Sequence, residues 1–580
     1  MKKKELTGYA SIDKPWEYFY SGIKKRNVFI NTTPYQGLIK NNSSFSERIA
    51  LEYFGAKISF GELIKNIDQV AKSLESYGVK KGNFITICST TTPEAIYAFY
   101  AISKIGAVAN LISPFYTPEE LTARIEECNS KLIIMADRFQ PKFKKALVND
   151  AEKIVIILPM MNSTFLRFVS PQYKVDGNTN EISWKTFLKH GASRRDTAVD
   201  PYEPQKPQAM VYSSGTTGAS KGIVLSVDSF QKLINTYGNS GFEISRGQKL
   251  YQNIPPWHST GISLGINLPL SFGVKVCIDP RFDHTIFVKN VLKFRPEYIL
   301  TNTTMYQGFT FEKSLKLLKG KSLAFLKYPF EGGEPLTEKD IANIENVFRK
   351  HGSNARLLNG YGECECGATV TTDINLHKFS NAASGIPLRD ITTVAIFDDE
   401  FNELKYGDQG NILVKTEIGM IEYFNNPKAT AKFFYIDKND DRWSKTGDIG
   451  YMNEDGSLVV LGRKSDYSVI NGIKIYNFDI ERAILTSDKV KLCEVQTHPA
   501  DKNRLVAHIV WNNGIASILK LNLKKQMEYF AEIQKHVMDN VHLPEAVPHS
   551  FCVRDNFPSA HSGKRDVQFI KNDIDELIEM

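Results

Sequence analysis

The sequence predicts an α/β protein with a large N-terminal domain of α/β sheets that includes a β-rich lobe, followed by a small α+β C-terminal domain. The chain has 580 residues, too many for one hydrophobic core. Short apolar runs alternate with segments of helical periodicity, as in parallel sheets covered by helices. After about residue 385 the pattern changes to short strands and turns. We therefore expect an extension at 1–42, the large domain at 43–463 with its lobe at about 385–461, and the C-terminal domain at 464–580.

The first half of the chain predicts alternating strands and helices. Ser59–Tyr77 has apolar residues at helical spacing and is followed by Gly78, a typical stop signal. Residues 1–42 show no clear period, and the polar, proline-containing residues 162–206 predict loop. Further strands are expected at Arg48–Phe54, Phe84–Ser89, Leu132–Ala136 and Ile154–Leu158, with a helix at Pro93–Ile105.

The second half first continues this alternation and then becomes richer in β-structure. Expected strands are Lys275–Ile278, Glu297–Thr301, Leu323–Phe330, Thr393–Phe397, Asn411–Lys415 and Ser457–Leu461. The last stretch predicts a strand and helix within Ile473–Leu485, a strand at Leu505–Val510 and a helix at about Leu521–Val541.

Composition indicates a globular protein with no strong preference for a charged partner. Hydrophobic residues make up 42% of the chain and charged residues 24%, and the formal net charge of +7 is small for this length. Basic clusters are short and scattered and lack interleaved aromatics, so solvated faces are favoured over contacts with lipid or nucleic acid. The most apolar run, Ile154–Met161, is too short to cross a bilayer. The oligomeric state is not indicated.

The cysteines predict a reducing compartment. There are seven, an odd number at irregular spacing in a long chain, which favours thiols over a disulfide framework. Cys364 and Cys366 could form half of a metal site, but no second pair has matching spacing. The basic N-terminus is followed by polar residues and not by the apolar core of a signal peptide. We expect a cytoplasmic protein.

The densest functional signal is Met210–Gly222, with the sequence MVYSSGTTGASKG. Its apolar start predicts the end of a strand. Glycines let backbone N–H groups approach an anion, hydroxyls add donors, and Lys221 adds a positive charge. The segment therefore predicts a binding site for a polyphosphate. It is not a Walker loop, which ends in Gly-Lys-Ser/Thr, because here Lys221 follows Ser220. The alternative is a Ser/Thr/Gly-rich surface turn.

This segment resembles the phosphate-binding signature of the adenylate-forming superfamily, which includes acyl- and aryl-CoA synthetases, adenylation domains of peptide synthetases, and luciferases. The resemblance implies that the loop binds ATP, that Lys221 and Thr216 act in catalysis, and that Thr216 contributes to a metal site. The remaining nucleotide-binding positions it implies in the loop are Ser213, Ser214, Gly215, Thr217 and Gly218.

Asn359–Glu365 resembles the family motif Asn-x-Tyr-Gly-x-Thr-Glu. The resemblance implies that Tyr361 stacks on adenine and that Glu365 acts in catalysis and binds Mg²⁺ through a carboxylate oxygen, the ligand type that magnesium prefers. Gly362 and Cys364 are the other implied nucleotide contacts. Cys364 stands where the family has threonine, and a thiol is a weaker donor than a hydroxyl.

Two further segments match the family near the nucleotide and the acid. Glu331–Leu336 resembles the Gly-Gly-x-Pro-Leu turn and implies nucleotide contacts from Gly332, Gly333 and Glu334. Ile254–His258 resembles the segment that places an aromatic residue or histidine beside the acyl pocket and thiol tunnel, which makes His258 a catalytic candidate. The alternative for His258 is a packed or solvent-facing side chain.

The C-terminal part carries the remaining motifs. Trp443–Asp448 resembles Trp-x-x-Thr-Gly-Asp and implies that Asp448 accepts hydrogen bonds from the ribose hydroxyls. Gly462–Asp466 resembles the family's hinge segment. Arg463 is retained and is a further implied nucleotide contact, whereas Ser465 stands at the usual hinge position. In the family the small C-terminal domain swings about this hinge.

Two further segments complete this comparison. Gly472 would line the pantetheine tunnel, although Asn477 replaces the usual proline after it. Pro558–Lys564 resembles the terminal Pro-x-Thr-x-x-Gly-Lys motif and implies that Lys564 is the adenylation lysine, with Ala560 in place of the threonine.

Together these motifs predict an ATP-dependent acid–thiol ligase that uses Mg²⁺, forms an acyl adenylate from a small carboxylate, and transfers the acyl group to coenzyme A. Phe115–Leu121 resembles a segment of acyl- and aryl-CoA synthetases and favours that branch. The expected acid is fatty, with an aryl acid as the alternative, since expected pocket residues such as Ile262, Leu264 and Thr303–Tyr306 are mostly apolar or small. An acyl carrier protein could replace coenzyme A. A degenerate nucleotide-binding protein is the remote alternative, suggested by Cys364, Ser465 and Ala560.

Overall fold

The computed structural model describes residues 6–147, 152–164, 173–175, 179–213, 220–281, 283–333, 338–373, 379–380, 383–512, 523–558, 566–574 and 577–580. Contacts divide the chain into two compact units. Unit 1 comprises residues 1–395, 413–445 and 453–458, and unit 2 comprises residues 396–412, 446–452 and 459–580. The domain boundaries expected from the sequence stay a prediction.

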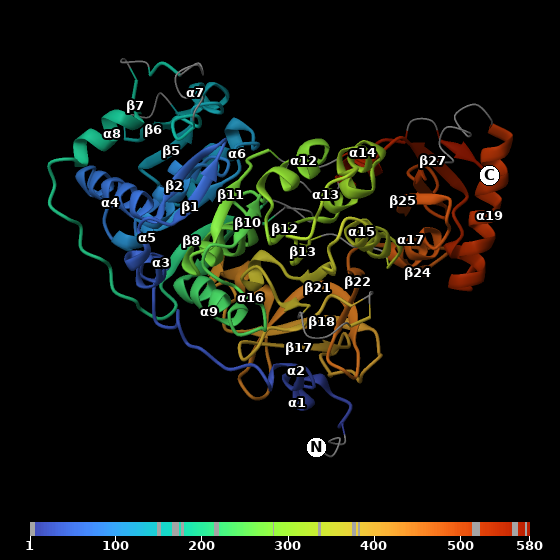
Figure 1. Cartoon of the computed structure of the whole chain (residues 1–580). Helices are drawn as coiled ribbons and strands as arrows, with labels where there is room; N and C mark the ends of the chain where they lie inside the picture. The colour runs from blue at the N-terminus through green and yellow to red at the C-terminus, as the bar shows by residue number, and fades with distance from the viewer. Residues whose placement is uncertain are drawn as a thin grey trace. The chain divides into compact units, whose positions relative to one another are not determined.

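Unit 1 contains a nine-stranded sheet in the order β16-β15-β14-β13-β12-β10-β11-β1-β2 (Figure 1). The six strands from β14 to β1 run parallel, and β2, β15 and β16 are antiparallel to their neighbours. The strands are β1 Ile49–Tyr53, β2 Ala56–Ser59, β10 Lys249–Gln252, β11 Lys275–Ile278, β12 Tyr298–Thr301, β13 Tyr328–Gly332, β14 Leu358–Tyr361, β15 Thr371–Thr372 and β16 Ile386–Pro387.

A second sheet of unit 1 has eight strands in the order β19-β9-β8-β4-β3-β5-β6-β7. Only β9, which pairs antiparallel with β8 and β19, departs from the parallel arrangement. The strands are β3 Phe84–Cys88, β4 Val108–Ile112, β5 Leu132–Ala136, β6 Ile154–Leu158, β7 Glu181–Ser183, β8 Pro207–Tyr212, β9 Gly222–Ser226 and β19 Glu422–Tyr423.

Two helices, α4 with one apolar face and the fully buried α5, fill the core shared by these sheets. Helix α4 (Phe60–Ser76) begins with a capping box, in which Ser59 and Glu62 satisfy each other's backbone N–H groups, and it buries Leu63, Ile67, Val70 and Leu74. Helix α5 (Pro93–Ile105) is buried along its whole length and ends at Gly106, whose φ is 73°. Both helices contribute to one cluster of buried side chains with β1, β3, β4, β8 and β11.

The remaining helices of unit 1 pack on one of the two sheets or join the core cluster of α4 and α5, and α1 and α2 lie near the N-terminus. Apolar residues of α6 and α7 pack on the eight-stranded sheet, and those of α12 and α15 on the nine-stranded sheet. The helices are α1 Ala10–Asp13, α2 Glu17–Tyr20, α3 Pro34–Asn42, α6 Pro118–Glu127, α7 Gln140–Leu147, α8 Trp184–Gly191, α9 Val227–Tyr237, α10 Ser259–Ile262, the π-helix Ser263–Asn267, α11 Leu268–Ser271, α12 His284–Phe294, α13 Thr303–Gln307, α14 Glu312–Leu318, α15 Glu338–Lys350 and α16 Pro427–Phe433.

A five-stranded sheet forms the β-rich lobe, in the order β17-β18-β21-β20 with β22 also paired to β21. Its strands are β17 Thr392–Phe397, β18 Gly410–Thr416, β20 Phe434–Ile436, β21 Arg442–Met452 and β22 Leu458–Arg463. The hairpin of β23 Tyr467–Ile470 and β24 Ile473–Tyr476 belongs to unit 2.

The main core of unit 2 lies between a four-stranded sheet and helices α17 and α19. The strands follow the order β25-β26-β27-β28. Their bounds and those of the helices of this unit are β25 Val490–Thr497, β26 Leu505–Trp511, β27 Ser550–Arg554, β28 Ile578–Glu579, α17 Asn477–Leu485, α19 Leu523–Val541 and α20 Val567–Asn572.

Two sequence-based expectations were wrong in detail. The strand predicted at Leu323–Phe330 is β13 at Tyr328–Gly332, because Leu323 and Leu326 are buried in the turn that precedes it. Residues 162–206 were predicted as loop, but they include β7 and α8. Ser183 caps α8 by accepting the Thr186 N–H, and Trp184 and Phe187 are buried in the core.

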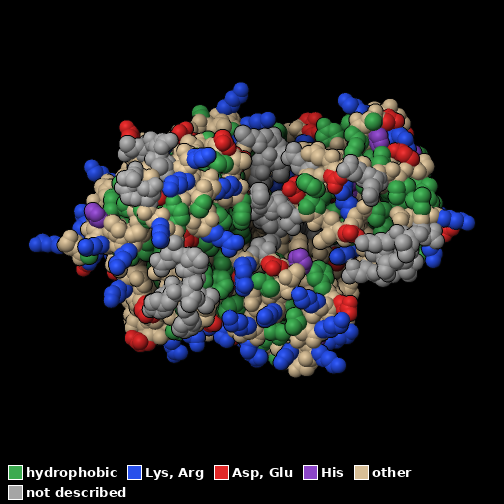
Figure 2. Space-filling view, turned by 90° about the horizontal axis from the view of Figure 1, so that it is seen from above, with side chains coloured by type: hydrophobic (Ala, Val, Ile, Leu, Met, Phe, Trp, Pro, Cys, Tyr) green, Lys and Arg blue, Asp and Glu red, His purple; other side chains and the backbone are tan. Residues whose placement is uncertain are grey.

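The visible surface shows no single strongly basic face. Lysine and arginine side chains are spread among acidic, apolar and other residues in the view from above (Figure 2). Among the described residues, no helix is both long enough and apolar enough to traverse a bilayer. No disulfide joins the seven cysteines, all of which are described.

Candidate active site

The described ends of the predicted phosphate loop are joined by three hydrogen bonds. Strand β8 leads into Ser213, and β9 begins directly after Lys221. The Ser213 N–H donates to the Lys221 carbonyl at 3.1 Å, the Lys221 N–H donates to Ser213 Oγ at 3.0 Å, and Ser220 Oγ donates to the Ser213 carbonyl at 2.7 Å. The predicted residues Ser214, Gly215, Thr216, Thr217 and Gly218 lie outside the described residues. The two described ends of the loop are therefore held together, with Lys221 at one of them.

Glycines allow close packing at the edge of the nine-stranded sheet where adenine is expected. Gly332 of β13 lies opposite Gly360 of β14, and a Cβ atom on Gly332 would be 3.0 Å from the Gly360 carbonyl oxygen. A Cβ atom on Gly362 would be only 2.2 Å from the Ala368 carbonyl oxygen, closer than such contacts allow. The structure thus brings Gly332, half-buried Tyr361 and Gly362 to the ends of two adjacent strands. Gly333 follows with φ of 95°, and Glu334 lies outside the described residues.

Glu365 has the chemistry of a magnesium ligand. It lies in the short turn Cys364–Cys366 and is half-buried. Its Oε1 atom accepts a hydrogen bond of 2.9 Å from the Tyr423 hydroxyl. Within the described part of the chain, Glu365 has no ion-pair partner. A hard carboxylate oxygen whose charge no described cation neutralises fits Mg²⁺.

The neighbouring cysteines differ in their surroundings. Cys366 is fully buried, and burial raises the pKa of its thiol well above the usual value, so the thiol stays protonated. Its Sγ atom donates to Glu363 Oε1 at 3.3 Å. Cys364 is half-buried, and its Sγ atom accepts a hydrogen bond of 3.1 Å from Ser259 Oγ. Cys364 therefore links this turn to the start of α10, directly after His258.

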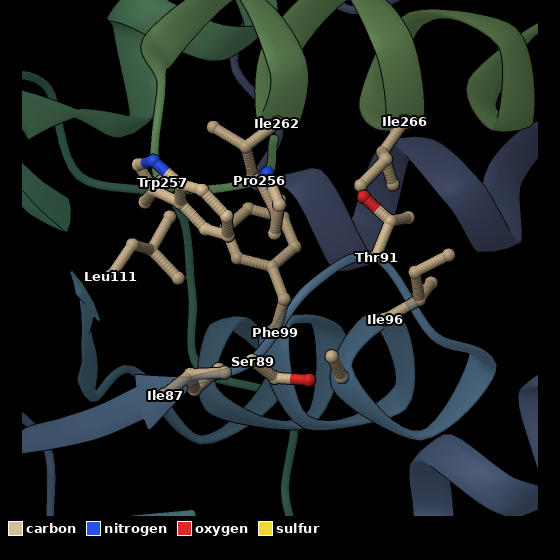
Figure 3. A pocket seen from close by; sticks show the side chains of 11 residues that line it. Ile87, Ser89, Thr91, Ile96, Phe99, Leu111, Pro256, Trp257, Ile262 and Ile266 are labelled. Atoms are coloured by element: carbon tan, nitrogen blue, oxygen red, sulfur yellow. The ribbon is translucent and has the colours of Figure 1, made fainter. Parts of the chain in front are cut away.

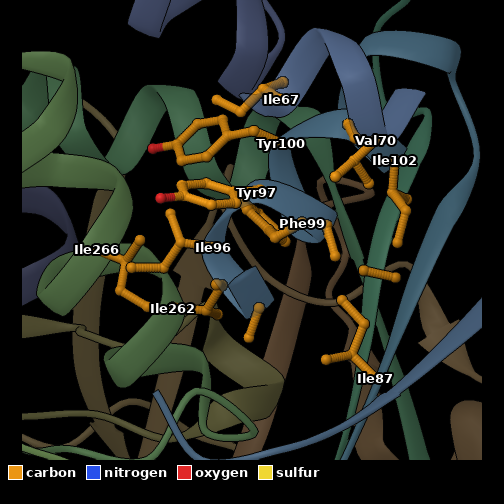
Figure 4. Packing of buried hydrophobic residues seen from close by; sticks show 14 of the residues in the cluster. Ile67, Val70, Ile87, Ile96, Tyr97, Phe99, Tyr100, Ile102, Ile262 and Ile266 are labelled. Atoms are coloured by element: carbon orange, nitrogen blue, oxygen red, sulfur yellow. The ribbon is translucent and has the colours of Figure 1, made fainter. Parts of the chain in front are cut away.

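The segment before α10 closes an apolar cavity within unit 1. Pro256 and Trp257 line it together with side chains from β3, α5, β4 and the helical stretch after His258. Figure 3 shows the Trp257 indole projecting toward Leu111 and Phe99. The complete lining is Ile87, Ser89, Thr91, Ala95, Ile96, Phe99, Leu111, Pro256, Trp257, Ile262 and Ile266. The cavity adjoins the core cluster that includes Ile67, Val70, Tyr97, Tyr100 and Ile102 (Figure 4). His258 is not part of this lining.

A second apolar cavity lies between the nine-stranded sheet, α9 and the π-helix. Its lining is Tyr237, Phe242, Ile244, Leu250, Leu264, Leu268, Tyr298, Leu300 and Phe330. The predicted pocket residues Ile262 and Leu264 thus line the first and second cavity, respectively. Thr303 and Tyr306 line neither, because Thr303 Oγ1 donates to Glu331 Oε1 at 2.6 Å and the buried Tyr306 hydroxyl lies 3.0 Å from the carbonyls of Ile299 and Phe330.

Unit 2 brings together two of the predicted nucleotide-binding residues. Asp448, which is 5% exposed, forms an ion pair with Arg463, in which Asp448 Oδ1 lies 3.0 Å from Arg463 Nε. Arg463 also donates to the Thr446 carbonyl at 3.1 Å, and the Asp448 N–H donates to Thr446 Oγ1 at 3.1 Å. Gly472 lies in the turn between β23 and β24 with φ of 82°. Lys564 lies outside the described residues.

Two tyrosines without a role assigned from the sequence contact the candidate site, one at the end of the phosphate loop and one at Glu365. The Tyr116 hydroxyl lies 3.3 Å from Ser220 Oγ, and Tyr423 contacts Glu365. Tyr116 lies in the segment Phe115–Leu121 that resembled CoA synthetases, so its neighbourhood gave a signal. Tyr423 lies in none of the motifs recognised in the sequence, and only the fold brings it into contact with Glu365.

Comparison with known proteins shows the family. Residues 39–424 match the family model described as AMP-binding enzyme, which is more than half of the chain. The chain therefore belongs to the AMP-binding enzyme family, and the predicted relationship is confirmed.

Curated relatives match over most of their length. The chain is 23% identical over 491 residues to a long-chain-fatty-acid–CoA ligase of Bacillus subtilis, covering 82% of this chain and 85% of the relative. It is 26% identical over 493 residues to a probable 4-coumarate–CoA ligase 3 of Dictyostelium discoideum, covering 82% and 84%.

Solved structures confirm the fold. The crystal structure of the anthranilate CoA ligase AuaEII with anthranoyl-AMP has a TM-score of 0.78 at 17% identity and covers 94% of this chain and 97% of its own. ATP-bound MatB from Rhodopseudomonas palustris has a TM-score of 0.76 at 20% identity and covers 94% and 99%. The chain thus shares its α/β architecture with these enzymes over nearly its whole length.

Proposed function

We propose that this AMP-binding enzyme is an ATP-dependent acid–thiol ligase. In the first half-reaction, a carboxylate oxygen of the acid forms a bond to the α-phosphorus of ATP, the α–β phosphoanhydride bond breaks, and pyrophosphate leaves. In the second, a thiolate attacks the acyl carbon and AMP leaves. One observation supports this most: the Lys221 ammonium lies 5.1 Å from the centre of the Tyr423 ring, whose hydroxyl donates to Glu365 at 2.9 Å. A cation and a carboxylate thus lie beside the phosphate loop.

The charge distribution suits attack by an anion on an anion. Lys221 and Lys564 would offset the repulsion between the carboxylate and the phosphates and stabilise charge that develops in the transition state. Thr216 and the other hydroxyls of the loop would donate hydrogen bonds to the phosphates. Glu365, with Thr216, would hold Mg²⁺, which when bound supplies further positive charge at the phosphate oxygens.

The nucleoside contacts are proposed from the glycine-lined strand ends and the acidic ribose site. Tyr361 would stack on adenine, with the backbone of Gly332, Gly333 and Glu334 along its edge. Asp448 would accept hydrogen bonds from the ribose hydroxyls, with Arg463 holding its carboxylate as it does in the structure. Gly472 would line the path of the thiol.

The acid is proposed to be apolar, with a fatty acid favoured and an aryl acid as the alternative. The cavity between the nine-stranded sheet and the π-helix is lined only by aliphatic and aromatic side chains, among them Leu264 and Phe330, but its volume of about 30 Å³ has room only for water, so these side chains must move apart before an acid can enter. Burial of apolar surface is the main source of affinity that such a lining offers. Curated relatives named for fatty acids and for 4-coumarate support the same range.

The thiol is proposed to be coenzyme A. The names of the curated relatives support it, since they are CoA ligases. An acyl carrier protein ends in the same phosphopantetheine thiol and is the alternative acceptor. The cytoplasm is the proposed location, supported by seven cysteines without a disulfide.

Replacement of Lys564 tests the division of the reaction. We expect Lys564→Ala to lower the rate of pyrophosphate release by about 100-fold or more, since it removes a positive charge from the transition state. Formation of the thioester from added acyl adenylate and coenzyme A should change by less than about threefold, since that step breaks no phosphoanhydride bond. The exposed Lys502→Ala serves as the control. Equal loss in both half-reactions would contradict the proposed role.

A further inference from the structure

Tyr423 lies between three parts of the candidate site. It belongs to the short strand β19, which pairs antiparallel with β9 so that Tyr423 is opposite Ile223. The flanking Phe424 N–H donates to the Gly222 carbonyl at 2.8 Å, and Gly222 directly follows Lys221. The Tyr423 side chain is 6% exposed and packs against Phe433, with 5.8 Å between ring centres. The backbone of β19 therefore fixes this tyrosine beside the exit of the phosphate loop.

The same strand segment holds the turn that carries Glu365. The Met420 N–H donates to the Glu365 carbonyl at 2.7 Å, and the Tyr423 hydroxyl donates to Glu365 Oε1 at 2.9 Å. Among the described residues, Tyr423 is the one hydrogen-bond donor to the Glu365 side chain.

The ring of Tyr423 contacts the other charged residue. The Lys221 Nζ atom lies 5.1 Å from the ring centre, within the range of a cation–π interaction. The hydroxyl and the face of one aromatic ring thus reach a carboxylate and an ammonium group that come from separate segments of the chain. Neither contact involves the residues that line the two apolar cavities.

We infer that Tyr423 is a positioning residue, whose hydroxyl orients the Glu365 carboxylate for the divalent cation while its ring supports Lys221 beside the phosphates. The inference rests on the proposed function, in which Glu365 binds Mg²⁺. Partners that orient a metal-binding carboxylate typically contribute about 10- to 100-fold in metal affinity or activity. The hydroxyl and the ring make separable contributions, since phenylalanine keeps the ring and loses only the donor.

The test compares Tyr423→Phe with the wild-type chain by a direct binding measurement. Mn²⁺ is titrated by electron paramagnetic resonance in the presence of α,β-methylene-ATP, which cannot be cleaved at the bond that breaks in the reaction. We expect the dissociation constant of the protein-bound Mn²⁺ to rise about 10-fold in Tyr423→Phe. In the pyrophosphate assay, the half-saturating Mg²⁺ concentration should rise in parallel, while the rate at saturating Mg²⁺ should recover to within about threefold of wild type.

Tyr77→Phe is the matched control, because the Tyr77 ring stacks on Phe187 and no described residue forms a hydrogen bond with its hydroxyl. It should bind Mn²⁺ as the wild type does. Equal Mn²⁺ affinity in Tyr423→Phe and wild type would overturn the inference, even if pyrophosphate release is normal. The inference would also be overturned if Tyr423→Phe lowered the Mn²⁺ affinity by the same factor in a Glu365→Gln background as in the wild-type background. The hydroxyl would then act independently of Glu365. Absence of carboxylate-dependent pyrophosphate release from the wild type would instead remove the proposed function, and the inference with it.

Discussion

At the residue scale, Asp373 at the end of β15 is an acid whose protonation is coupled to folding. Its Oδ2 atom accepts the Asn359 N–H at 3.2 Å, and its Oδ1 atom is buried without a hydrogen-bond partner among the described residues. Burial raises the pKa of Asp373 from 3.8 to about 7. The folded state therefore binds the proton of Asp373 more tightly than the unfolded state. The contribution of this proton to the stability of the fold is complete below about pH 4 and is lost as the pH rises through about 7.

Asp373→Asn should remove this pH dependence. Asparagine resembles the protonated acid and can still accept the Asn359 N–H. The free energy of unfolding is measured by urea denaturation at pH 5 and at pH 8. We expect the difference between variant and wild type to be about 2–3 kcal/mol more in favour of the variant at pH 8 than at pH 5. The exposed Asp408→Asn is the control. A difference between variant and wild type that is the same at both pH values would rule out a raised pKa for Asp373.

Single residues also show where sequence reasoning stops. Tyr361, Glu365, Asp448 and Lys221 could be assigned from local motifs, because each stands in a short segment with characteristic neighbours. Tyr423 could not, since its contact with Glu365 spans 58 positions and depends on the pairing of β19 with β9. A hydrogen bond between segments this distant in the chain leaves no periodic pattern in the sequence.

At the scale of elements, a partly buried ionic cluster joins four segments of unit 2. Carboxylate oxygens of Asp466, Glu481 and Glu494 lie within 4.8 Å of one another. Lys571 of α20 lies 2.8 Å from Asp466 and 3.6 Å from Glu494. Burial raises the pKa of Glu481 well above the usual value, and Glu494 and Asp466 raise it further. Burial lowers the pKa of Lys571, but Asp466 and Glu494 raise it more, so its net pKa is above the ordinary value.

Lys571→Met should therefore destabilise unit 2. It leaves one buried and two half-buried carboxylates without their cation. Breaking a fully buried pair typically costs about 3–5 kcal/mol, and the partial exposure of Asp466 and Lys571 reduces the expected cost to about 1–3 kcal/mol. The loss should be larger at pH 8 than at pH 5, because Glu481, whose pKa is raised, takes up a proton as the pH falls and then no longer needs the cation. Differential scanning calorimetry of the full chain measures the transition, with the exposed Lys502→Met as the control. A variant as stable as wild type at pH 8 would show that the ion pairs contribute nothing net.

Element prediction succeeded where periodicity was strong and failed where tertiary contacts decide. Helix α4 follows the spacing of its apolar residues, and β3, β5 and β6 follow short apolar runs with polar flanks. Helix α8 was missed because its eight residues are too few for a clear period; its burial against α4 and the sheet stabilises it. The start of β13 was misplaced because a buried apolar turn and a strand look alike in sequence.

At the scale of the whole molecule, the order of strands and helices was sufficient to predict the α/β class. The grouping of residues 396–412 with residues 459–580 could not be predicted, because it depends on long-range strand pairing. The likeness to solved structures over 94% of the chain agrees with the predicted fold class. Family membership and the apolar cavities then lead to one central claim, that the chain couples cleavage of ATP to activation of an apolar acid.

The most direct test measures pyrophosphate release from ATP across a panel of carboxylates. The panel contains short, medium and long fatty acids, benzoates, cinnamates and amino acids, each with and without coenzyme A. We predict release with an apolar class, most strongly with fatty acids, and increased turnover with coenzyme A together with a thioester product. Release that coenzyme A does not change would indicate a carrier protein as the acceptor. No release with any acid would contradict the central claim and favour a degenerate nucleotide-binding protein.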